Sequence, residues 1–227
     1  NYIYMKPKNC LIFGASGQIG RNLIRCLTKN NIKVTALTRN IHQKGYILKT
    51  QANPGYLEIV EGSIFDHELV EKLFSNADLC VNLIGILFEK GKNNFNNIHI
   101  EFPKMISRYA STYKLEKFVH LSALGIENAK DSIYAQSKLK GEEEILNNFN
   151  KAVIVRHSIV YSVDDNFTTQ LMTLLGLLPI FPIYYNGKTK FRPIFCSDLT
   201  NSITKIITDA LQDYIVDLGS PEGMACR

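Results

Sequence analysis

Seven residues near the start of the chain, GASGQIG at 14–20, have the types and spacing of a phosphate-binding turn. Gly14 permits the tight turn, Gly17 lets a pyrophosphate approach the backbone, and Gly20 lets a helix and a strand pack closely. The helix that follows directs free N–H groups at the phosphates. The apolar run 9–14 is typical of a buried strand, and residues 18–29 have helical spacing. This context favours a dinucleotide site over a glycine-rich turn without a ligand.

The residue that follows the second strand-like run, 33–38, predicts which dinucleotide would bind. An NAD-selective site has an acidic residue there, which accepts a hydrogen bond from the ribose 2′-hydroxyl. Arg39 stands there instead, and a guanidinium pairs with a 2′-phosphate that a carboxylate would repel. The sequence therefore predicts NADP(H) as the preferred cofactor, with NAD(H) as the alternative. Arg21 is a second candidate for this phosphate, and solvated surface arginines are the other interpretation of both residues.

A tyrosine and a lysine four residues apart, Tyr134 and Lys138, could carry acid–base chemistry. On a helix they share one face, and the lysine cation would lower the pKa of the phenol from about 10 toward neutrality. Tyr134 would then exchange a proton with a carbonyl or an alcohol, while Lys138 binds the nicotinamide ribose. The pair follows a strand-like run at 118–122, in which we interpret His120 as a packed residue rather than a catalytic one.

Strand-like and helix-like segments alternate along the chain and must position these side chains. Further strands are expected at 56–60, 78–84, 118–122 and 152–155. Helices are expected at 66–74 with Asp66 as N-cap, at 97–113 with a kink or restart at Pro103, and at 134–149. The alternation predicts an α/β fold, a Rossmann-type doubly wound parallel sheet with helices on both faces. We assign residues 1–160 to this NAD(P)-binding domain, and 161–227 to a small, shortened, irregular C-terminal lobe packed on the same unit.

Composition excludes several classes of protein. Hydrophobic residues make up 45% and charged residues 21% of the 227 residues, which excludes disordered chains and collagen-like fibres. The net charge of +5 is mild and the basic residues are scattered, so we expect no nucleic-acid partner. The five cysteines lie far apart and the histidines lack metal-ligand spacing. We therefore expect a reducing compartment, with neither a disulfide framework nor a metal site.

One stretch, residues 166–187, contains no charged residue. Glycine and proline residues interrupt it, so we expect no transmembrane span. Its first part has apolar residues at helical spacing from Phe167 to Leu178. This helix would pack over the cofactor cleft or, together with the apolar loop 179–185, dock onto a partner subunit or a membrane surface.

The order of the motifs resembles that of the short-chain dehydrogenase/reductase superfamily, which includes the NAD-dependent epimerases and dehydratases, in its extended or atypical branch. The glycine motif is followed by VNLIG at 81–85, FVHLSALG at 118–125, YAQSK at 134–138 and FRPIFCSD at 191–198. Within the superfamily, the pattern is similar to the NADPH-binding accessory subunits of respiratory complex I and their bacterial homologues. The resemblance implies cofactor contacts from Gly14, Ser16, Gly17, Gln18, Ile19, Gly20, Arg39, Ser63, Ile64, Leu83, Ile84, Gly85 and Lys138.

Two departures from the family pattern concern the site. The resemblance places Tyr134 and Lys138 at the nicotinamide end, with a catalytic Ser or Thr at the position of Ala123. The alanine lacks the hydroxyl that polarises a substrate carbonyl, and Ser122 is the remaining candidate for that catalytic role. Ser63 stands where relatives carry an aspartate that meets the adenine amino group.

Two functions are compatible with this combination. The first is a structural or assembly role, in which the protein holds NADPH inside a respiratory NADH dehydrogenase, complex I, and contacts its subunits. The second is an active oxidoreductase, epimerase or dehydratase that uses Tyr134 and Lys138 on a small carbonyl or sugar-nucleotide substrate. We expect a cytoplasmic location, which in the first case is peripheral on the inner face of an energy-transducing membrane.

Overall fold

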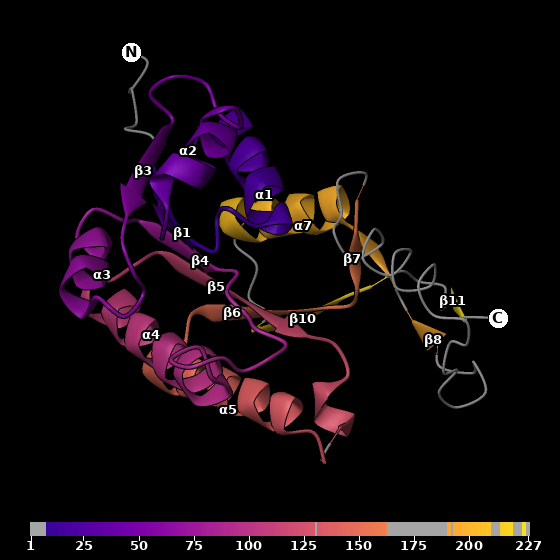
Figure 1. Ribbon diagram of the computed structural model, residues 1–227. Helices are drawn as coiled ribbons and strands as arrows, with labels where there is room; N and C mark the ends of the chain where they lie inside the picture. Colours follow the sequence, from indigo (N-terminus) through magenta and orange to yellow (C-terminus); the bar gives the residue numbers. More distant parts are fainter. Residues whose placement is uncertain are drawn as a thin grey trace.

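The computed structural model describes residues 8–129, 131–162, 190–191, 193–209, 214–219 and 224–225 (Figure 1). Its centre is a sheet of seven parallel strands in the order β10-β6-β5-β4-β1-β2-β3. These strands are β1 (Asn9–Phe13), β2 (Lys33–Thr38), β3 (Leu57–Glu61), β4 (Leu79–Asn82), β5 (Lys117–Ala123), β6 (Ala152–His157) and β10 (Ile215–Leu218).

Helices connect the strands, and short strand pairs lie outside the main sheet. The α-helices are α1 (Gln18–Lys29), α2 (Ile41–Lys49), α3 (His67–Phe74), α4 (Phe102–Thr112), α5 (Ile133–Asn148) and α7 (Cys196–Thr208). A π-helix, η1 (Asn96–Glu101), precedes α4, and a 3-10 turn, η2 (Ile126–Asn128), precedes α5. Outside the sheet, β7 (Val160–Tyr161) pairs in parallel with β9 (Ile194–Phe195), and β8 (Lys190–Phe191) pairs antiparallel with β11 (Met224–Ala225).

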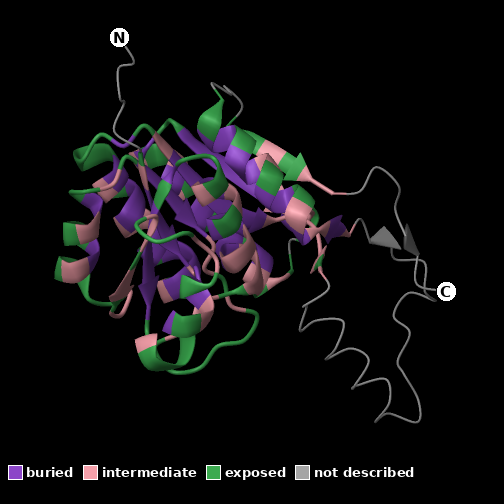
Figure 2. Ribbon diagram, turned by 90° about the horizontal axis from the view of Figure 1, so that it is seen from above, coloured by how far each residue is buried: buried purple, intermediate pink, exposed green. Residues whose placement is uncertain are grey.

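Side chains of the sheet alternate between two apolar clusters, one on each face. In β1, Cys10 and Ile12 belong to the cluster under α1 and α7, whereas Leu11 and Phe13 belong to the cluster under α3, α4 and α5. Figure 1 shows these two groups of helices on opposite faces, and Figure 2 shows the buried residues concentrated in the sheet. The chain therefore has the predicted doubly wound α/β fold with helices on both faces.

Local signals in the sequence locate several elements correctly. The structure gives β2 and α1 the predicted bounds. Asp66 caps α3 as expected, since its carboxylate accepts a hydrogen bond from the backbone N–H of Leu69 at 3.1 Å. Pro103 lies in the first turn of α4, directly after η1. The helix restarts there because proline lacks the N–H that a helix interior requires.

Three elements differ from the expectations. The helix α2 begins after Asn40, whose side chain accepts a hydrogen bond from Gln43 N–H at 3.0 Å, although its sequence has little amphipathic character. The strand β10 extends the sheet beside β6. Apolar residues at helical spacing pack α7 into the core: Leu199, Ile203, Ile206 and Ile207. Regular elements therefore continue beyond residue 160, contrary to the expectation of an irregular lobe, because α7 and β10 complete the central layers.

Several expectations fall on residues that the structure does not describe. The helix predicted from Phe167 to Leu178 and the apolar loop 179–185 lie outside the described residues. In the described ranges no helix has the length and apolar character to cross a membrane. The same ranges hold no group of three or more His, Cys, Asp or Glu residues that could bind a metal ion.

Candidate functional site

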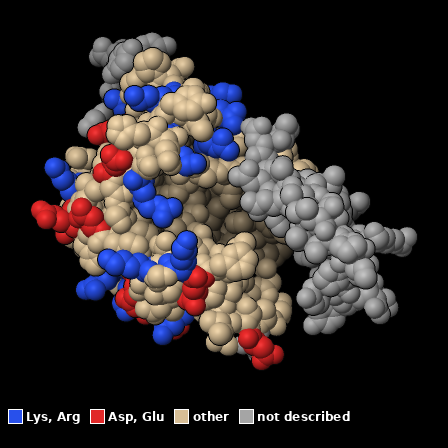
Figure 3. All heavy atoms as spheres, viewed as in Figure 1, with Lys and Arg blue, Asp and Glu red and all other residues tan. Residues whose placement is uncertain are grey.

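The strand order reverses between β1 and β4, and the predicted site residues gather at this point. From β1 the chain proceeds to β2 and β3 on one side, and from β4 to β5 and β6 on the other. Ligands of open parallel sheets bind in the crevice outside the carboxyl ends of the strands at such a point. Figure 3 shows a hollow in the middle of this face, bordered by Lys and Arg side chains on the side away from the undescribed residues. A basic border suits a ligand that carries phosphates.

The glycine motif forms the turn between β1 and α1. Gly14 has a φ of +83°, in the left-handed region, and a Cβ atom on it would lie 3.2 Å from the backbone of Leu83. A Cβ atom on Gly20 would lie 2.5 Å from the backbone of Ala15, so no side chain fits there. Gly17 differs, because a Cβ atom on it would meet only the carbonyl oxygen of Gly14, at 3.4 Å. The space in front of Gly17 is open, as the approach of a pyrophosphate requires.

The first turn of α1 has no side-chain cap. Gly17 is its N-cap residue, and the turn contains no acidic residue. The first N–H groups of a helix need partners from outside the helix, and the helix dipole makes an anion a favourable partner. Ser16, Gln18 and Ile19 are partly buried around this turn, and the Gln18 amide donates a hydrogen bond to Oγ of Ser162 at 2.7 Å. This hydrogen bond fixes the turn, while the first backbone N–H groups of α1 remain available to bind an anion.

The residues predicted for the adenosine half lie near the carboxyl ends of β2 and β3. Arg39 follows β2, is exposed, and has no hydrogen-bond or ion-pair partner in the described part of the chain. Arg21, in α1, is half-buried, and its Nε has no hydrogen-bond partner in the part of the chain that the structure describes. Ser63 and Ile64 follow β3, and Ile64 lines a cavity of about 670 Å³ between the β3–α3 loop, α3 and α4. The predicted catalytic pair does not line this cavity.

A buried hydrogen-bond network supports the segment after β4, which contains Leu83, Ile84 and Gly85. Asn82 accepts a hydrogen bond from the backbone N–H of Ile84 at 3.1 Å, and its amide nitrogen donates to Nδ1 of His120 at 3.0 Å. The ring proton of His120 is therefore on Nε2. Burial, followed by the proximity of Lys138 and His99, lowers the His120 pKa well below its usual range. The interpretation of His120 as a packed residue is confirmed, since it is 1% exposed.

Lys138 extends from α5 to the carboxyl ends of β4 and β5. It is 5% exposed, and its Nζ donates a hydrogen bond to the carbonyl oxygen of Leu121 at 3.3 Å. A Cβ atom on Gly85 would lie 3.3 Å from this Nζ, so the fold brings Lys138 beside the predicted ribose segment. Burial lowers the Lys138 pKa to about 8, although nearby Glu142 acts in the opposite direction. Lys138 is thus an ammonium group that loses its proton far more readily than an exposed lysine.

Tyr134 lies one turn before Lys138 on α5 and is half-buried. Its ring packs edge-on against the rings of Phe95 and His99, with centroids 5.9 and 5.4 Å away. Burial raises the Tyr134 pKa above its usual value. The expectation that Lys138 lowers the pKa of this phenol is therefore wrong, because the surrounding rings exclude water and disfavour the phenolate.

His99 is a central residue of the site that the sequence reasoning missed. It is buried in η1, and its Nε2 accepts a hydrogen bond from the backbone N–H of Ile86 at 3.2 Å. Nδ1 therefore carries the proton and donates to Oγ of Ser137 at 2.9 Å, while Ser137 donates to the carbonyl oxygen of Tyr134 at 2.7 Å. Burial, and then Lys138, lower the His99 pKa to about 3. A neutral His99 thus ties the segment after β4 to the start of α5.

Ser122 and Ala123 end β5, where a substrate carbonyl would need a hydrogen-bond donor. Ser122 is 1% exposed, and its Oγ has no hydrogen-bond partner among the described residues. Strand alternation places Ser122 on the same face as His120, the face that α5 covers. Ala123 is half-buried and offers no donor. The end of β5 therefore keeps one unused hydroxyl on the face of the sheet that carries Lys138.

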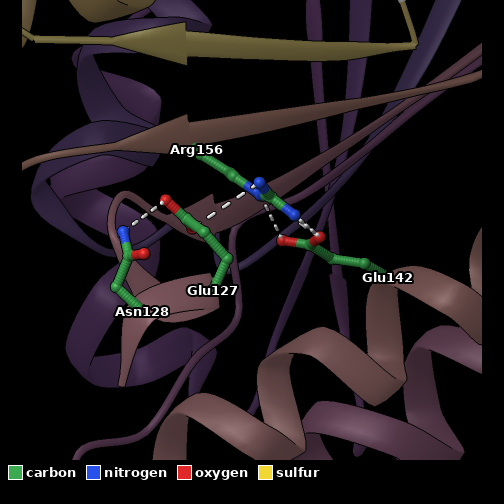
Figure 4. A network of polar contacts seen from close by, with 4 residues as sticks. All are labelled: Glu127, Asn128, Glu142 and Arg156. Carbon is green, nitrogen blue, oxygen red and sulfur yellow. Dashed lines mark hydrogen bonds and ion pairs between the residues drawn. The ribbon is translucent and has the colours of Figure 1, made fainter. Parts of the chain in front are cut away.

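A charged network lies behind Lys138, on the next turn of α5 (Figure 4). Glu142 is 3% exposed, and Arg156 of β6 binds its carboxylate with Nε 3.1 Å from Oε1 and Nη2 2.6 Å from Oε2. Glu127 of η2 lies 3.6 Å from Nη1 of Arg156 and accepts a hydrogen bond from Asn128 at 3.2 Å. This network joins α5 to β6 and η2. The sequence reasoning did not place Glu142 or Arg156 in the site.

Comparisons with known proteins agree with this geometry. The sequence profile of the NmrA-like family matches residues 6–135. NADH dehydrogenase (ubiquinone) 1 alpha subcomplex subunit 9, mitochondrial, of Mus musculus is 24% identical over 87% of this chain and 52% of its own length. The ceramide reductase of Caulobacter vibrioides is 25% identical over 76% of this chain and 52% of its own length. The chain spans about half the length of these relatives.

Solved structures share the fold. WbmH from Bordetella bronchiseptica, in complex with NAD+, has a TM-score of 0.78 and 20% identity, over 96% of this chain and 77% of its own. UDP-glucuronic acid 4-epimerase from Bacillus cereus, in complex with NAD, has a TM-score of 0.77 and 20% identity, over 96% of this chain and 80% of its own. With the named relatives, these structures confirm the resemblance to extended short-chain dehydrogenases and to complex I accessory subunits. Because the family profile covers more than half of the sequence, the chain belongs to the NmrA-like family.

Proposed function

We propose that this protein binds a nicotinamide dinucleotide, NADP(H) in preference to NAD(H), as a structural cofactor within a respiratory NADH dehydrogenase assembly. The observation that carries the cofactor proposal is the uncapped N-terminus of α1 behind an open glycine turn. The neighbours solved with NAD support it as well. The name of the mitochondrial relative in Mus musculus supports the assembly role.

In this proposal the cofactor follows the carboxyl edge of the sheet. The pyrophosphate binds the turn 14–20, and the exposed, unpaired Arg39 binds the 2′-phosphate. The adenine lies beside Ser63 and Ile64, and the nicotinamide ribose lies between the segment 83–85 and Lys138. When bound, the dinucleotide supplies a hydride donor or acceptor.

Two features favour a structural cofactor over a catalytic one. Ala123 provides no hydroxyl for a substrate carbonyl at the end of β5. The raised pKa of Tyr134 keeps the phenol neutral, so that it cannot act as a base near neutral pH. The partners in this proposal are other subunits of the complex, and the location is peripheral on the inner face of an energy-transducing membrane.

An oxidoreductase, epimerase or dehydratase is the second candidate function. The observation that favours it is the juxtaposition of Tyr134 and a buried Lys138 on α5. Tyr134 would donate its proton as a neutral phenol, Lys138 would bind the ribose, and the unpaired Oγ of Ser122 would donate to the carbonyl oxygen. The name of the ceramide reductase of Caulobacter vibrioides is consistent with chemistry of this class.

Mass spectrometry of the dinucleotide released from purified, unfolded protein tests the cofactor. Release of NADP(H) supports the proposal, and release of NAD(H) alone contradicts the assigned selectivity. If no dinucleotide is released, calorimetric titration with NADPH and NADH is the second measurement. An absence of heat with both coenzymes would refute the cofactor proposal.

Turnover and co-purification separate the two candidate functions. The wild-type protein is mixed with NADPH and a panel of carbonyl compounds, with Tyr134→Phe as the matched variant. Oxidation of NADPH that disappears in Tyr134→Phe identifies an enzyme and contradicts the structural role. Co-purification with membrane-embedded NADH dehydrogenase subunits, without turnover, supports the structural role.

A further inference from the structure

Lys138 and Glu142 lie one turn apart on the same face of α5 without forming an ion pair. They are 5% and 3% exposed. Buried opposite charges at this spacing would be expected to pair with each other, because each otherwise lacks compensation for its lost hydration. Within the described residues each has a different partner. Lys138 donates to the carbonyl oxygen of Leu121, and Glu142 binds Arg156.

Arg156 occupies both oxygens of the Glu142 carboxylate (Figure 4). Its Nε lies 3.1 Å from Oε1 and 3.2 Å from Oε2, and its Nη2 lies 2.6 Å from Oε2. This is the forked geometry that makes a guanidinium a stronger carboxylate partner than an ammonium. Glu127 holds the remaining nitrogen, Nη1, at 3.6 Å. Both oxygens of the Glu142 carboxylate are therefore bound by Arg156.

Glu142 is the carboxylate that influences Lys138 most directly. The other titratable groups facing Lys138 are Tyr134 on α5, His99 from η1, His120 from β5 and His157 from β6. Burial lowers the pKa of all three histidines, so their rings are neutral at physiological pH, and burial keeps the Tyr134 phenol neutral. Because these groups are uncharged, none of them forms an ion pair with the Lys138 ammonium in place of a ligand.

We propose that Arg156 is a positioning residue: by holding both oxygens of Glu142, it keeps the Lys138 ammonium free for a ligand instead of locking it in an internal ion pair. For the identity of that ligand, the nicotinamide ribose, the inference rests on the proposed function. The state of Lys138 itself can be measured in the protein without any dinucleotide.

An NMR titration of the lysine side-chain Cε signals, with the Lys138 signal assigned by its loss in Lys138→Met, tests the inference. In the wild-type protein this signal is expected to titrate near pH 8. In Arg156→Met, Glu142 is released and pairs with Lys138, and a nearby carboxylate favours the charged form of a lysine. We expect the Lys138 pKa to rise by at least about one unit, which is a tenfold change in the proton-binding constant.

Three further variants keep the inference testable if Arg156→Met does not fold. Arg156→Lys keeps a cation but cannot grip both oxygens, so it should raise the Lys138 pKa by a smaller amount. The double variant Arg156→Met/Glu142→Gln removes both charges and should return the Lys138 pKa to the wild-type value or slightly below it. Glu144→Gln is the matched control: Glu144 is on the same helix but pairs with Lys104 at 3.2 Å, and its loss should leave Lys138 unchanged.

The outcomes separate a positioning role from a purely structural one. A raised Lys138 pKa in Arg156→Met or Arg156→Lys, reversed in the double variant, supports the inference. An unchanged Lys138 pKa in the folded single variants, with only a lower melting temperature, overturns it and leaves Arg156 as a structural brace. Calorimetry with NADPH then tests the ligand separately: if the wild-type protein binds no dinucleotide, the proposed function fails while the Lys138 titration still decides the role of Arg156.

Discussion

Lys138 carries its charge where little water reaches it, and this burial has a measurable energetic cost. Its pKa is about 8 in the folded protein, against an ordinary value of 10.5. Between these values the unfolded chain holds the proton and the folded protein does not, so stability rises as pH rises from about 8 to 10. Below pH 8 the folded state carries the full cost of the buried ammonium.

Replacing this ammonium should therefore stabilise the protein at low pH more than at high pH. We expect Lys138→Met to stabilise the dinucleotide-free protein by up to about 3 kcal/mol at pH 7 and by only about 1 kcal/mol at pH 10. Urea unfolding at the two pH values measures the difference. The exposed Lys140, on the same helix, is the control, and Lys140→Met should change little at either pH. A gain that is equal at both pH values would contradict the assigned pKa.

Arg39 is the residue on which the cofactor selectivity depends. Since it is exposed and unpaired within the described residues, Arg39→Ala should weaken NADPH binding by roughly ten- to a hundredfold and NADH binding by less than about twofold. Calorimetric titration with both coenzymes measures the effect. Arg25→Ala is the matched control, because Arg25 is an exposed arginine of α1 that donates to Asn22 at 2.9 Å. Equal losses for both coenzymes would show that Arg39 does not read the 2′-phosphate.

At the scale of elements, two glycines of the turn between β1 and α1 have different roles: Gly20 in packing and Gly17 in dinucleotide binding. The two glycines that flank the open space respond differently to a methyl group, because a Cβ atom would clash at Gly20 and not at Gly17. Gly20→Ala should lower the free energy of unfolding by more than about 2 kcal/mol. Gly17→Ala should leave stability within about 1 kcal/mol of wild type while weakening dinucleotide binding at least about tenfold. Thermal unfolding and calorimetry check the pair, and unaltered binding in Gly17→Ala would mean that phosphates do not occupy the turn.

Elements with strong local signals could be predicted from the sequence, and weakly patterned ones could not. The helix α1 follows from its apolar spacing behind the glycine turn, and the restart at Pro103 follows from the missing N–H. By contrast, α2 has little amphipathic character, so only the cap at Asn40 marks its start. Apolar spacing does mark α7, but hydroxyl-bearing residues between the apolar positions obscure it.

Among the site residues, too, only those marked by a local pattern could be predicted from the sequence. Glycine spacing and the Tyr134–Lys138 interval are local, so the sequence could indicate them. The raised pKa of Tyr134 depends on the rings of Phe95 and His99, which only the fold brings to it. The only sequence signal for His99 is a polar residue between two isoleucines in an apolar run. The pairing of Glu142 with Arg156 depends on how α5 lies against β6, which no local pattern encodes.

At the scale of the whole molecule, α7 supplies part of the core that the first six strands need. Four of its buried side chains, Leu199, Ile203, Ile206 and Ile207, belong to the same apolar cluster as the inner face of α1. Burial of each such side chain contributes about 1.5–3 kcal/mol, so the four together approach the whole stability of a typical domain.

A fragment that ends at residue 162 should therefore fail to fold. We expect no cooperative unfolding transition by circular dichroism and a soluble aggregate or an expanded chain on gel filtration. The full chain of 227 residues, prepared in parallel, is the control. A fragment that unfolds cooperatively, with a melting temperature within a few degrees of the full chain, would show that the first 160 residues form an independent domain.

The link that His99 makes between the segment after β4 and the start of α5 also bears on how these two segments can move. Its neutral ring is hydrogen-bonded at both nitrogens, to the backbone N–H of Ile86 and to Oγ of Ser137. Moving either segment away from the other would break one of these hydrogen bonds, which costs about 1–3 kcal/mol when a buried group is left without a partner. The spacing between these two segments is therefore favoured already in the ligand-free protein, before anything binds beside Lys138.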